Sequence, residues 1–298
     1  MKRKYKAFQK ELQEKSRRYF KEKGYKVEKR GYILEKHDDW KNNIILPAVV
    51  EYILKKKDES EKNKKHFSLH KYLHHGLSSQ ACIFNLLGPF IAEKDYKTLR
   101  EIINLSPGIG LKGNIVEAEF EFTDTKVFDE KTGQPTSIDL YVKTDTSEKV
   151  FVEFKFTEAE FGTCSVYEEG DCDGRNPKSN LSMCYLHEKG RNYMKLMEKY
   201  GLLRDSESCP FTEFYQAYRL LLFALENDGK FLFVFDERNP TFLIEEKGIL
   251  RGKYARFRDL LPDKMKEKVS MLTIQKIVDY IEKNTKSNWI GEFKRRYM

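Results

Sequence analysis

The sequence predicts an α/β protein with a helical extension at its N-terminus. Its hydrophobic periodicity is helical up to about residue 115 and then changes to alternation, and the unbroken apolar run FLFVF follows at 231–235. Alternation is typical of a half-buried strand, whereas an unbroken apolar run is typical of a strand buried on both faces. The predicted order is helices, three strands, helices, two strands and helices, which favours a single α/β domain.

The composition excludes several classes of protein. The chain has 298 residues, a formal net charge of +8 and 13% aromatic residues, as expected of a globular protein and not of a disordered or fibrous one. No apolar run reaches the roughly 20 residues of a membrane span. The basic N-terminus lacks the apolar segment of a secretory signal. We therefore expect a cytoplasmic protein with no membrane partner.

Basic residues are concentrated at the N-terminus. Residues 1–30 contain thirteen Lys and Arg against four Glu, a net charge of +9, so the rest of the chain sums to −1. Tyr5, Phe8 and Leu12 recur at helical spacing, which indicates a basic amphipathic helix. It is either an arm that contacts the phosphates of DNA or a docked helix with a solvated lysine-rich face. The DNA-contacting candidates are Lys2, Arg3, Lys4, Arg17 and Arg18.

Two helices are predicted between this segment and the first strand. Residues 42–57 predict a short apolar helix, and a buried helix is expected after Ser78 or Ser79, either of which is a suitable N-cap. A charged loop lies between the two helices. We place the domain boundary there, with a basic helical extension at 1–65 and the main domain at 66–298.

Three strands follow, and polar turns join them. In the first, VEAEFEF at 116–122, apolar and acidic residues alternate. Ile138, Leu140 and Val142 form the apolar face of the second, and the third is VFVEFKF at 150–156. The short turn between the second and third strands predicts an antiparallel meander.

A glycine-rich loop at 162–182 opens the second half of the chain. The remaining predicted elements are helices at 183–200 and 210–227, strands at 231–235 and 241–246, and helices near 253–260 and 273–283. The strand at 241–246 is expected near a sheet edge.

Three charged residues stand out on the second and third strands. The third strand is apolar except for Glu153 and Lys155, and Asp139 lies opposite the apolar row of the second. Charged side chains are costly to bury unless they are paired or bind a metal. Because Phe151 and Phe156 put aromatic rings on both sides of the third strand, a half-covered cleft is favoured over the alternative, an exposed sheet face.

These residue types suit phosphodiester hydrolysis. Two converging carboxylates, Asp139 and Glu153, provide the oxygen ligands that Mg²⁺ or Mn²⁺ prefers. Such a metal activates water and binds the charge that develops on a phosphate. Lys155 could orient that water, help to deprotonate it or neutralise phosphate charge.

The motif IDLYV followed by VFVEFKFTE resembles the signature of the PD-(D/E)XK nuclease superfamily, an Asp on one strand and Glu-x-Lys on the next. Further segments over residues 66–245, such as LSSQACIFNLLGPF and CPFTEFYQAYRLLLFA, resemble bacterial proteins described as restriction-endonuclease-like. The resemblance implies a mixed central sheet flanked by helices and Mg²⁺-dependent cleavage of DNA. It also implies that Asp139 and Glu153 bind the metal and that Lys155 positions the attacking water.

One position departs from the superfamily pattern. The helix before the strands often supplies an acidic residue, but here it offers Gln80. Glu119, Glu121 and Glu117 on the first strand, in that order of preference, are candidates for the missing carboxylate. The alternative is that all three lie on an exposed face.

Gln216 and Arg219 lie three residues apart and therefore share a helix face. Related nucleases have Gln-x-x-x-Tyr in a comparable helix, but Leu220 stands at the Tyr position here. The pair either contacts a DNA phosphate or forms a polar stripe on a packed helix.

Four of the five cysteines follow the third strand within 46 residues (Cys164, Cys172, Cys184 and Cys209). Four thiolates can bind Zn²⁺ or an iron–sulfur cluster, although the spacing, with seven, eleven and twenty-four residues between successive cysteines, matches no ordinary zinc module. Free thiols are the alternative.

The leading hypothesis is a metal-dependent DNA endonuclease of PD-(D/E)XK type that uses a metal-activated water, and cleavage of both DNA strands would favour a homodimer. Two alternative hypotheses are a catalytically silent DNA-binding module on the same fold and an exonuclease with an iron–sulfur cluster.

Overall fold

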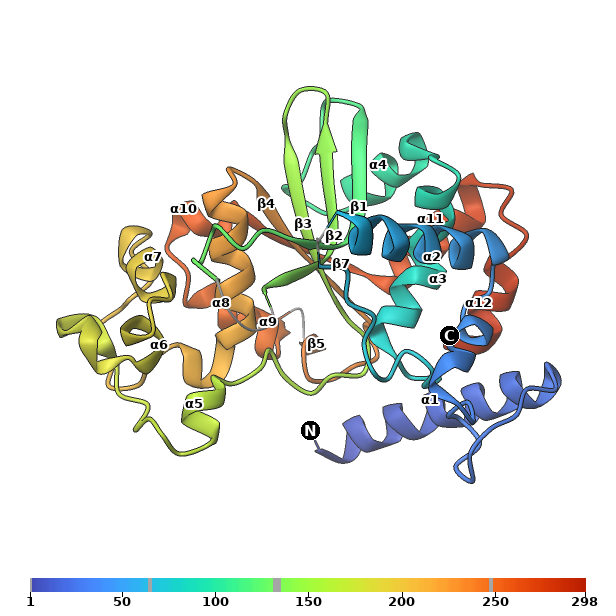
Figure 1. The fold of residues 1–298 in the computed structure, drawn as a ribbon, viewed down its shortest axis with the longest axis horizontal. Helices are drawn as coiled ribbons and strands as arrows, with labels where there is room; N and C mark the ends of the chain where they lie inside the picture. The colour runs from blue at the N-terminus through green and yellow to red at the C-terminus, as the bar shows by residue number, and fades with distance from the viewer. Residues whose placement is uncertain (1, 64–65, 131–134, 247–248) are drawn as a thin grey trace.

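A five-stranded mixed sheet lies between two groups of helices (Figure 1). The structure is a computed structural model that describes residues 2–63, 66–130, 135–246 and 249–298. The strand order is β1-β2-β3-β4-β7, antiparallel from β1 to β3 and parallel from β3 to β7. This confirms the predicted α/β class with a mixed sheet flanked by helices. The strands are β1 Ile115–Thr123, β2 Ser137–Thr144, β3 Lys149–Lys155, β4 Lys230–Phe235 and β7 Val269–Thr273.

Each face of the sheet is buried by its own hydrophobic cluster. In β4, Leu232 and Val234 belong to one cluster, whereas Phe231, Phe233 and Phe235 belong to the other. The first is covered by α2 (Pro47–Lys62), α3 (Ser79–Ala92), α4 (Tyr96–Asn104), α11 (Ile274–Asn284) and α12 (Ile290–Tyr297). The second is covered by α7 (Tyr193–Lys199), α8 (Phe211–Glu226) and α9 (Lys253–Asp259). The unbroken apolar run at 231–235 therefore forms a strand buried on both faces, as predicted.

Short elements connect these helices and strands. They are η1 His37–Asn43, α5 Ser165–Glu168, η2 Pro177–Ser179, η3 Leu181–Met183, α6 Tyr185–Glu188 and α10 Asp263–Lys266. Among the described residues, no helix is long and apolar enough to cross a lipid bilayer.

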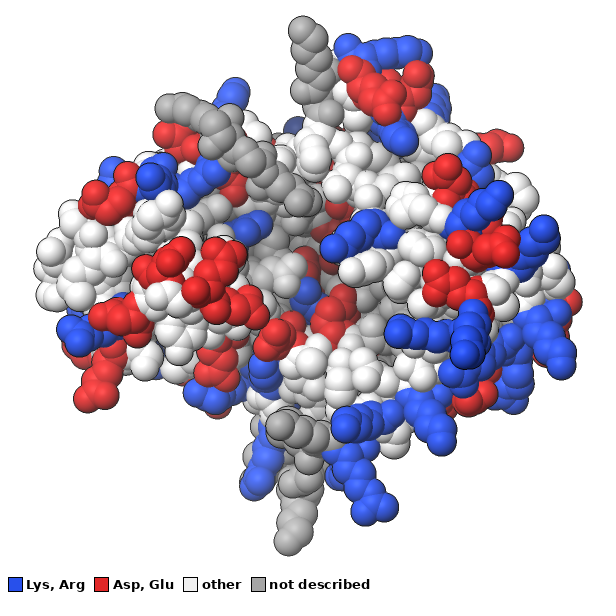
Figure 2. Space-filling view, turned by 60° about the horizontal axis from the view of Figure 1, so that its bottom comes forward, with Lys and Arg blue, Asp and Glu red and all other residues white. Residues whose placement is uncertain are grey.

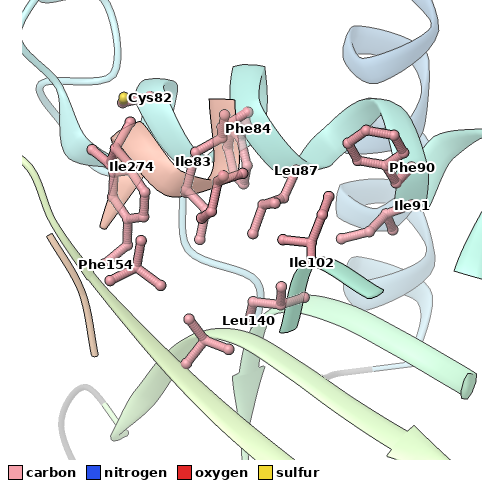
Figure 3. Packing of buried hydrophobic residues seen from close by; sticks show 14 of the residues in the cluster. Cys82, Ile83, Phe84, Leu87, Phe90, Ile91, Ile102, Leu140, Phe154 and Ile274 are labelled. Carbon is pink, nitrogen blue, oxygen red and sulfur yellow. The ribbon is translucent and has the colours of Figure 1, made fainter. Parts of the chain in front are cut away.

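Helix α3 fills the centre of the first hydrophobic cluster. Ser78 caps it by accepting a hydrogen bond from a backbone N–H of the first turn (3.2 Å), so the first of the two expected caps is the one used. Figure 3 shows Phe84 and Leu87 in the layer between α3 and the strand residues Leu140 and Phe154. This packing fixes α3 against the strands that carry the acidic residues.

The N-terminal helix α1, Lys2–Glu22, is docked on the rest of the protein (Figure 1). Leu12 belongs to the first hydrophobic cluster, and Tyr19 Oη donates a hydrogen bond to Glu292 of α12 (2.7 Å). Helix α1 is therefore packed against the rest of the protein, as the docked-helix interpretation predicted. Whether its exposed face also binds DNA stays a prediction, and so does the domain boundary at residue 65.

The predicted alternation is wrong at three positions, Val116, Glu121 and Ile138. In β1 the register shifts between Ile115 and Glu117, and Val116 is 56% exposed instead of facing the core. Glu121 adopts a left-handed backbone (φ +53°), a conformation rare for residues other than glycine. On the second strand, Ile138 packs in the second hydrophobic cluster and not beside its predicted neighbours.

The last strand of the sheet is also not the predicted one. Within 241–246, only β5, Ile244–Glu246, is extended, and it pairs with β6, Ile249–Arg251, in a separate two-stranded sheet. The edge of the main sheet is β7, which pairs parallel with β4. Its five residues, VSMLT, are too few to show a clear periodicity.

Candidate active site

Asp139, Glu153 and Lys155 come together where β2 and β3 pair, as the sequence analysis expected. The backbone N–H of Phe154 donates a 2.7 Å hydrogen bond to Asp139 Oδ2, which fixes this carboxylate against β3. Glu153 is 2% exposed and Lys155 is 5% exposed. The interpretation of β3 as an exposed sheet face is therefore wrong.

Gln216 of α8 completes a closed set of contacts with the two charged residues of β3. Lys155 Nζ lies 2.7 Å from Glu153 Oε1 and donates a 2.7 Å hydrogen bond to Gln216 Oε1. Gln216 Nε2 in turn donates to Glu153 Oε1 (2.7 Å). The Gln216 amide is thus hydrogen-bonded to both Lys155 and Glu153 and lies inside the site.

A third buried carboxylate belongs to Glu121, not to Glu119. Glu121 is 8% exposed and lines the same cleft as Asp139. Glu119 instead faces α2, where its carboxylate lies 3.5 Å from Lys56 Nζ. The structure therefore brings the second of the three candidates into the site and leaves the first outside it. Glu117, the third candidate, is exposed and also lies outside the cleft.

Two neutral side chains hold Glu121 in place. Gln80 Nε2 donates to Glu121 Oε1 (2.7 Å), and Ser137 Oγ donates to Glu121 Oε2 (2.8 Å). Gln80 Oε1 accepts from the backbone N–H of His70 (2.8 Å), so its carbonyl is already engaged. Gln80 is therefore a positioning residue for a carboxylate that comes from the strand. Ser137 was not predicted, although it lies two residues before Asp139 and so shares its strand face.

Burial raises the pKa values of all three carboxyl groups. It raises that of Glu121 to about 7, and it raises that of Asp139 well above the usual range, helped by the nearby charge of Glu153. The pKa of Glu153 is also raised by burial, although Lys155 opposes the shift. Three carboxylates facing one cation leave excess negative charge, which protons or a metal ion would offset.

Lys155 is protonated in this setting. Burial opposes its charge, but the neighbouring carboxylates of Glu153, Glu158 and Asp139 together outweigh burial, and the pKa of Lys155 is raised. A lysine with a raised pKa donates hydrogen bonds and positive charge, and it is a poor general base.

These residues lie in a cleft of about 810 Å³. Its other walls include Gln9 and Gln13 from α1 and the rings of His70 and Tyr72. Figure 2 shows a hollow in the middle of this face, with acidic side chains inside it and basic side chains gathered on the lower right of the molecule. The cleft is therefore open to solvent and lined by more acidic than basic side chains.

Arg219 lies on the wall of the cleft formed by α8. Its guanidinium lies over the rings of Tyr215 (5.0 Å) and Tyr193 (5.9 Å), and Nη1 donates to Tyr215 Oη (3.2 Å). Its buried Nε has no hydrogen-bond partner. Arg219 thus combines a fixed position with an unused donor, whereas Gln216, its expected companion, is engaged within the site.

The basic candidates of α1 differ in their surroundings. Arg3, Lys4 and Arg18 are exposed. Arg17 is engaged by its own neighbours, because Nε donates to the backbone oxygen of Arg30 (2.7 Å). The side chain of Lys2 lies outside the described residues.

The four later cysteines line a second, smaller cavity that is distinct from the cleft. Cys82 is separate from them, fully buried in the first hydrophobic cluster. All five cysteines are free thiols. In the described parts of the chain, no three or more His, Cys, Asp or Glu side chains are already placed to hold a metal ion.

The full length of the chain matches a known protein family. The family described as Restriction Endonuclease associating with ARP matches residues 3–298. The chain belongs to this family. No match is found among curated proteins or among solved structures. Membership in the Restriction Endonuclease associating with ARP family, together with the mixed sheet, makes this a restriction-endonuclease-like protein and indicates a nuclease-like function.

Proposed function

We propose that this protein is a Mg²⁺-dependent deoxyribonuclease of PD-(D/E)XK type that hydrolyses phosphodiester bonds in DNA. The observation that carries the proposal is the burial of three carboxylates and one lysine, Glu121, Asp139, Glu153 and Lys155, in a single open cleft. Burying such a set without a function would be costly. The family's restriction-endonuclease character supports the same conclusion.

The donor set fits a divalent cation. Asp139, Glu153 and Glu121 would hold Mg²⁺ or Mn²⁺, since carboxylate oxygens are the preferred ligands and the ion offsets their excess negative charge. When bound, such an ion activates water and neutralises charge on the phosphate. Each of these carboxylates is already oriented by a hydrogen bond from the protein, Glu121 from Gln80, Asp139 from the backbone of Phe154 and Glu153 from Gln216.

The protein's own residues supply the remaining parts. Lys155, protonated and fixed by Glu153 and Gln216, donates a hydrogen bond that orients the attacking water, and its charge stabilises the phosphate as negative charge develops. Arg219, on the adjoining wall of the cleft, supplies positive charge that attracts a phosphate.

A plasmid-cleavage assay with Mg²⁺ tests the proposal. The wild-type protein should cleave DNA. The Asp139→Asn and Lys155→Ala variants should lose about 100-fold or more of this activity. Glu119→Gln is the matched control, because it removes a carboxylate from the same sheet at a position outside the cleft. Wild-type rates in both site variants would refute the assignment.

A catalytically silent DNA-binding module is the second candidate. It is favoured by one observation, that no group of three or more His, Cys, Asp or Glu side chains in the described residues is already arranged to hold a metal ion. Titration with Mn²⁺ separates the two: a nuclease binds the ion in a manner that requires Asp139, whereas a silent module binds DNA without it.

A further inference from the structure

The four later cysteines converge on one place in the fold although they are spread over 46 residues. All four line a single cavity of about 20 Å³ between α5, α6 and the start of α8. Backbone pairing brings their segments together: Cys164 N donates to Phe211 O (3.0 Å), and Cys209 N donates to Gly174 O (2.8 Å). The arrangement is therefore built by the fold and is not a chance cluster on the surface.

Backbone N–H groups lie near the four sulfurs. The Sγ atom of Cys172 accepts a hydrogen bond from the backbone N–H of Gly174, two residues later (3.4 Å). Burial raises the pKa of the Cys164, Cys184 and Cys209 thiols, and nearby backbone N–H groups, among them those of Val166, Leu186 and Phe211, oppose that shift. Backbone N–H groups directed at sulfur stabilise a thiolate ligand and fix its orientation.

The surrounding segment has little else to hold its shape. Between α5 and α7 the described elements are three or four residues long, and glycines with positive φ stand at 170, 174 and 190. Gly174 is a position that needs glycine, because an added Cβ would lie 2.6 Å from the ring of Tyr167. Short turns around four inward thiols are what a metal ion stabilises in small structural sites.

We propose that Cys164, Cys172, Cys184 and Cys209 form a structural site for one divalent zinc-class ion. Zn²⁺ accepts four thiolates in a tetrahedral arrangement. The cavity has room for about one water-sized body, which suits a single ion and is too small for an iron–sulfur cluster. The thiols do not yet stand at metal-binding positions, so binding closes them around the ion and releases their protons. The site is separate from the carboxylate cleft and does not depend on the function proposed for it.

Metal analysis of the full-length protein, purified without chelator from zinc-supplemented cells, tests this site. We expect about one zinc per chain, released when a mercurial reagent blocks the thiols and detected with a zinc-sensitive dye. Cys172→Ser and Cys184→Ser should each lose the zinc. Cys82→Ala and Asp139→Asn are the matched controls and should keep it, since one removes a thiol from the opposite core and the other removes a carboxylate from the cleft.

Cobalt substitution provides a readout that does not depend on whether the variants fold. Co²⁺ added to the metal-depleted wild-type protein should give the visible absorption of tetrahedral thiolate coordination. The proposal is overturned if the folded wild-type protein contains no stoichiometric zinc and gives no such spectrum. A brown protein that contains iron and inorganic sulfide would also overturn it.

Discussion

Gln80 Nε2 donates a 2.7 Å hydrogen bond to Glu121 Oε1 and so joins the first turn of α3 to a carboxylate of β1. At the helix position where the PD-(D/E)XK pattern often has an acid, this protein has an amide that orients an acid from the neighbouring strand. The negative charge is thus supplied by β1, and α3 supplies its alignment.

Replacement of Gln80 tests this alignment. In Gln80→Ala, Glu121 loses a donor, and the Mg²⁺ concentration for half-maximal cleavage should rise about 10–100-fold, as for other residues that orient metal ligands. Activity at saturating Mg²⁺ should change much less. A loss of activity that Mg²⁺ does not restore would show that Gln80 acts in another way.

Glu121 and Glu119 form a matched pair, since both lie on β1 two residues apart. Glu121→Gln should weaken Mn²⁺ binding by about tenfold or more, because it removes a buried donor oxygen from the cleft. Glu119→Gln should leave binding unchanged, because that side chain faces Lys56. Calorimetric titration of both variants makes the comparison. Equal effects of the two substitutions would contradict the assignment of Glu121.

Stability in the absence of divalent cations should depend on pH through Glu121. Its pKa is raised from 4.5 to about 7 in the folded protein. Between these values the folded state binds more protons than the unfolded state, so the free energy of unfolding falls as pH rises. Above about pH 7 this contribution is constant.

The difference in melting temperature between wild type and Glu121→Gln, measured in EDTA, isolates this effect. The melting temperature of Glu121→Gln should rise relative to that of wild type as pH rises from about 4.5 to about 7. Added Mg²⁺ should reduce the gain by offsetting the charge of wild type. A difference that does not change with pH would contradict a raised pKa of Glu121.

The exposed basic residues of α1 can be tested without removing the helix. Deletion of residues 1–30 would also remove Leu12 and Phe20 from the core. Replacement of Arg3, Lys4 and Arg18 by Glu should weaken DNA binding and reduce its salt dependence by about 0.9 for each lost phosphate contact. Fluorescence anisotropy at several salt concentrations measures both.

The control for this experiment is a variant with the same change of charge elsewhere. Lys264 of α10, Lys283 of α11 and Lys286, which follows α11, are exposed and lie outside α1. If replacing these three lysines by Glu has the same effect as the α1 variant, α1 is a docked helix whose basic face is only solvated.

The sequence was sufficient for four of the five strands of the main sheet and for the centre of the site. Periodicity located β1 to β4, and the rarity of charge within an apolar strand selected Asp139, Glu153 and Lys155. These predictions needed only local patterns, because side chains two apart on a strand share a face. Paired strands then bring such side chains together.

The rest depended on contacts that no local pattern encodes. Glu121 lies in the site because its backbone is left-handed, whereas a prediction from periodicity assumes a regular strand backbone. Gln216 reaches Glu153 across 63 residues of chain, and β7 becomes a strand because β4 offers it a parallel edge. The convergence of the cysteines likewise depends on backbone pairing between distant segments.

The central claim is that Asp139 and Glu153 bind a divalent cation, and a crystal soaked in Mn²⁺ tests it most directly. We predict an anomalous scattering peak within coordination distance of both carboxylates, and no peak in crystals of Asp139→Asn. The absence of a peak between these residues in the wild-type protein, or a peak that persists without the Asp139 carboxylate, would contradict it.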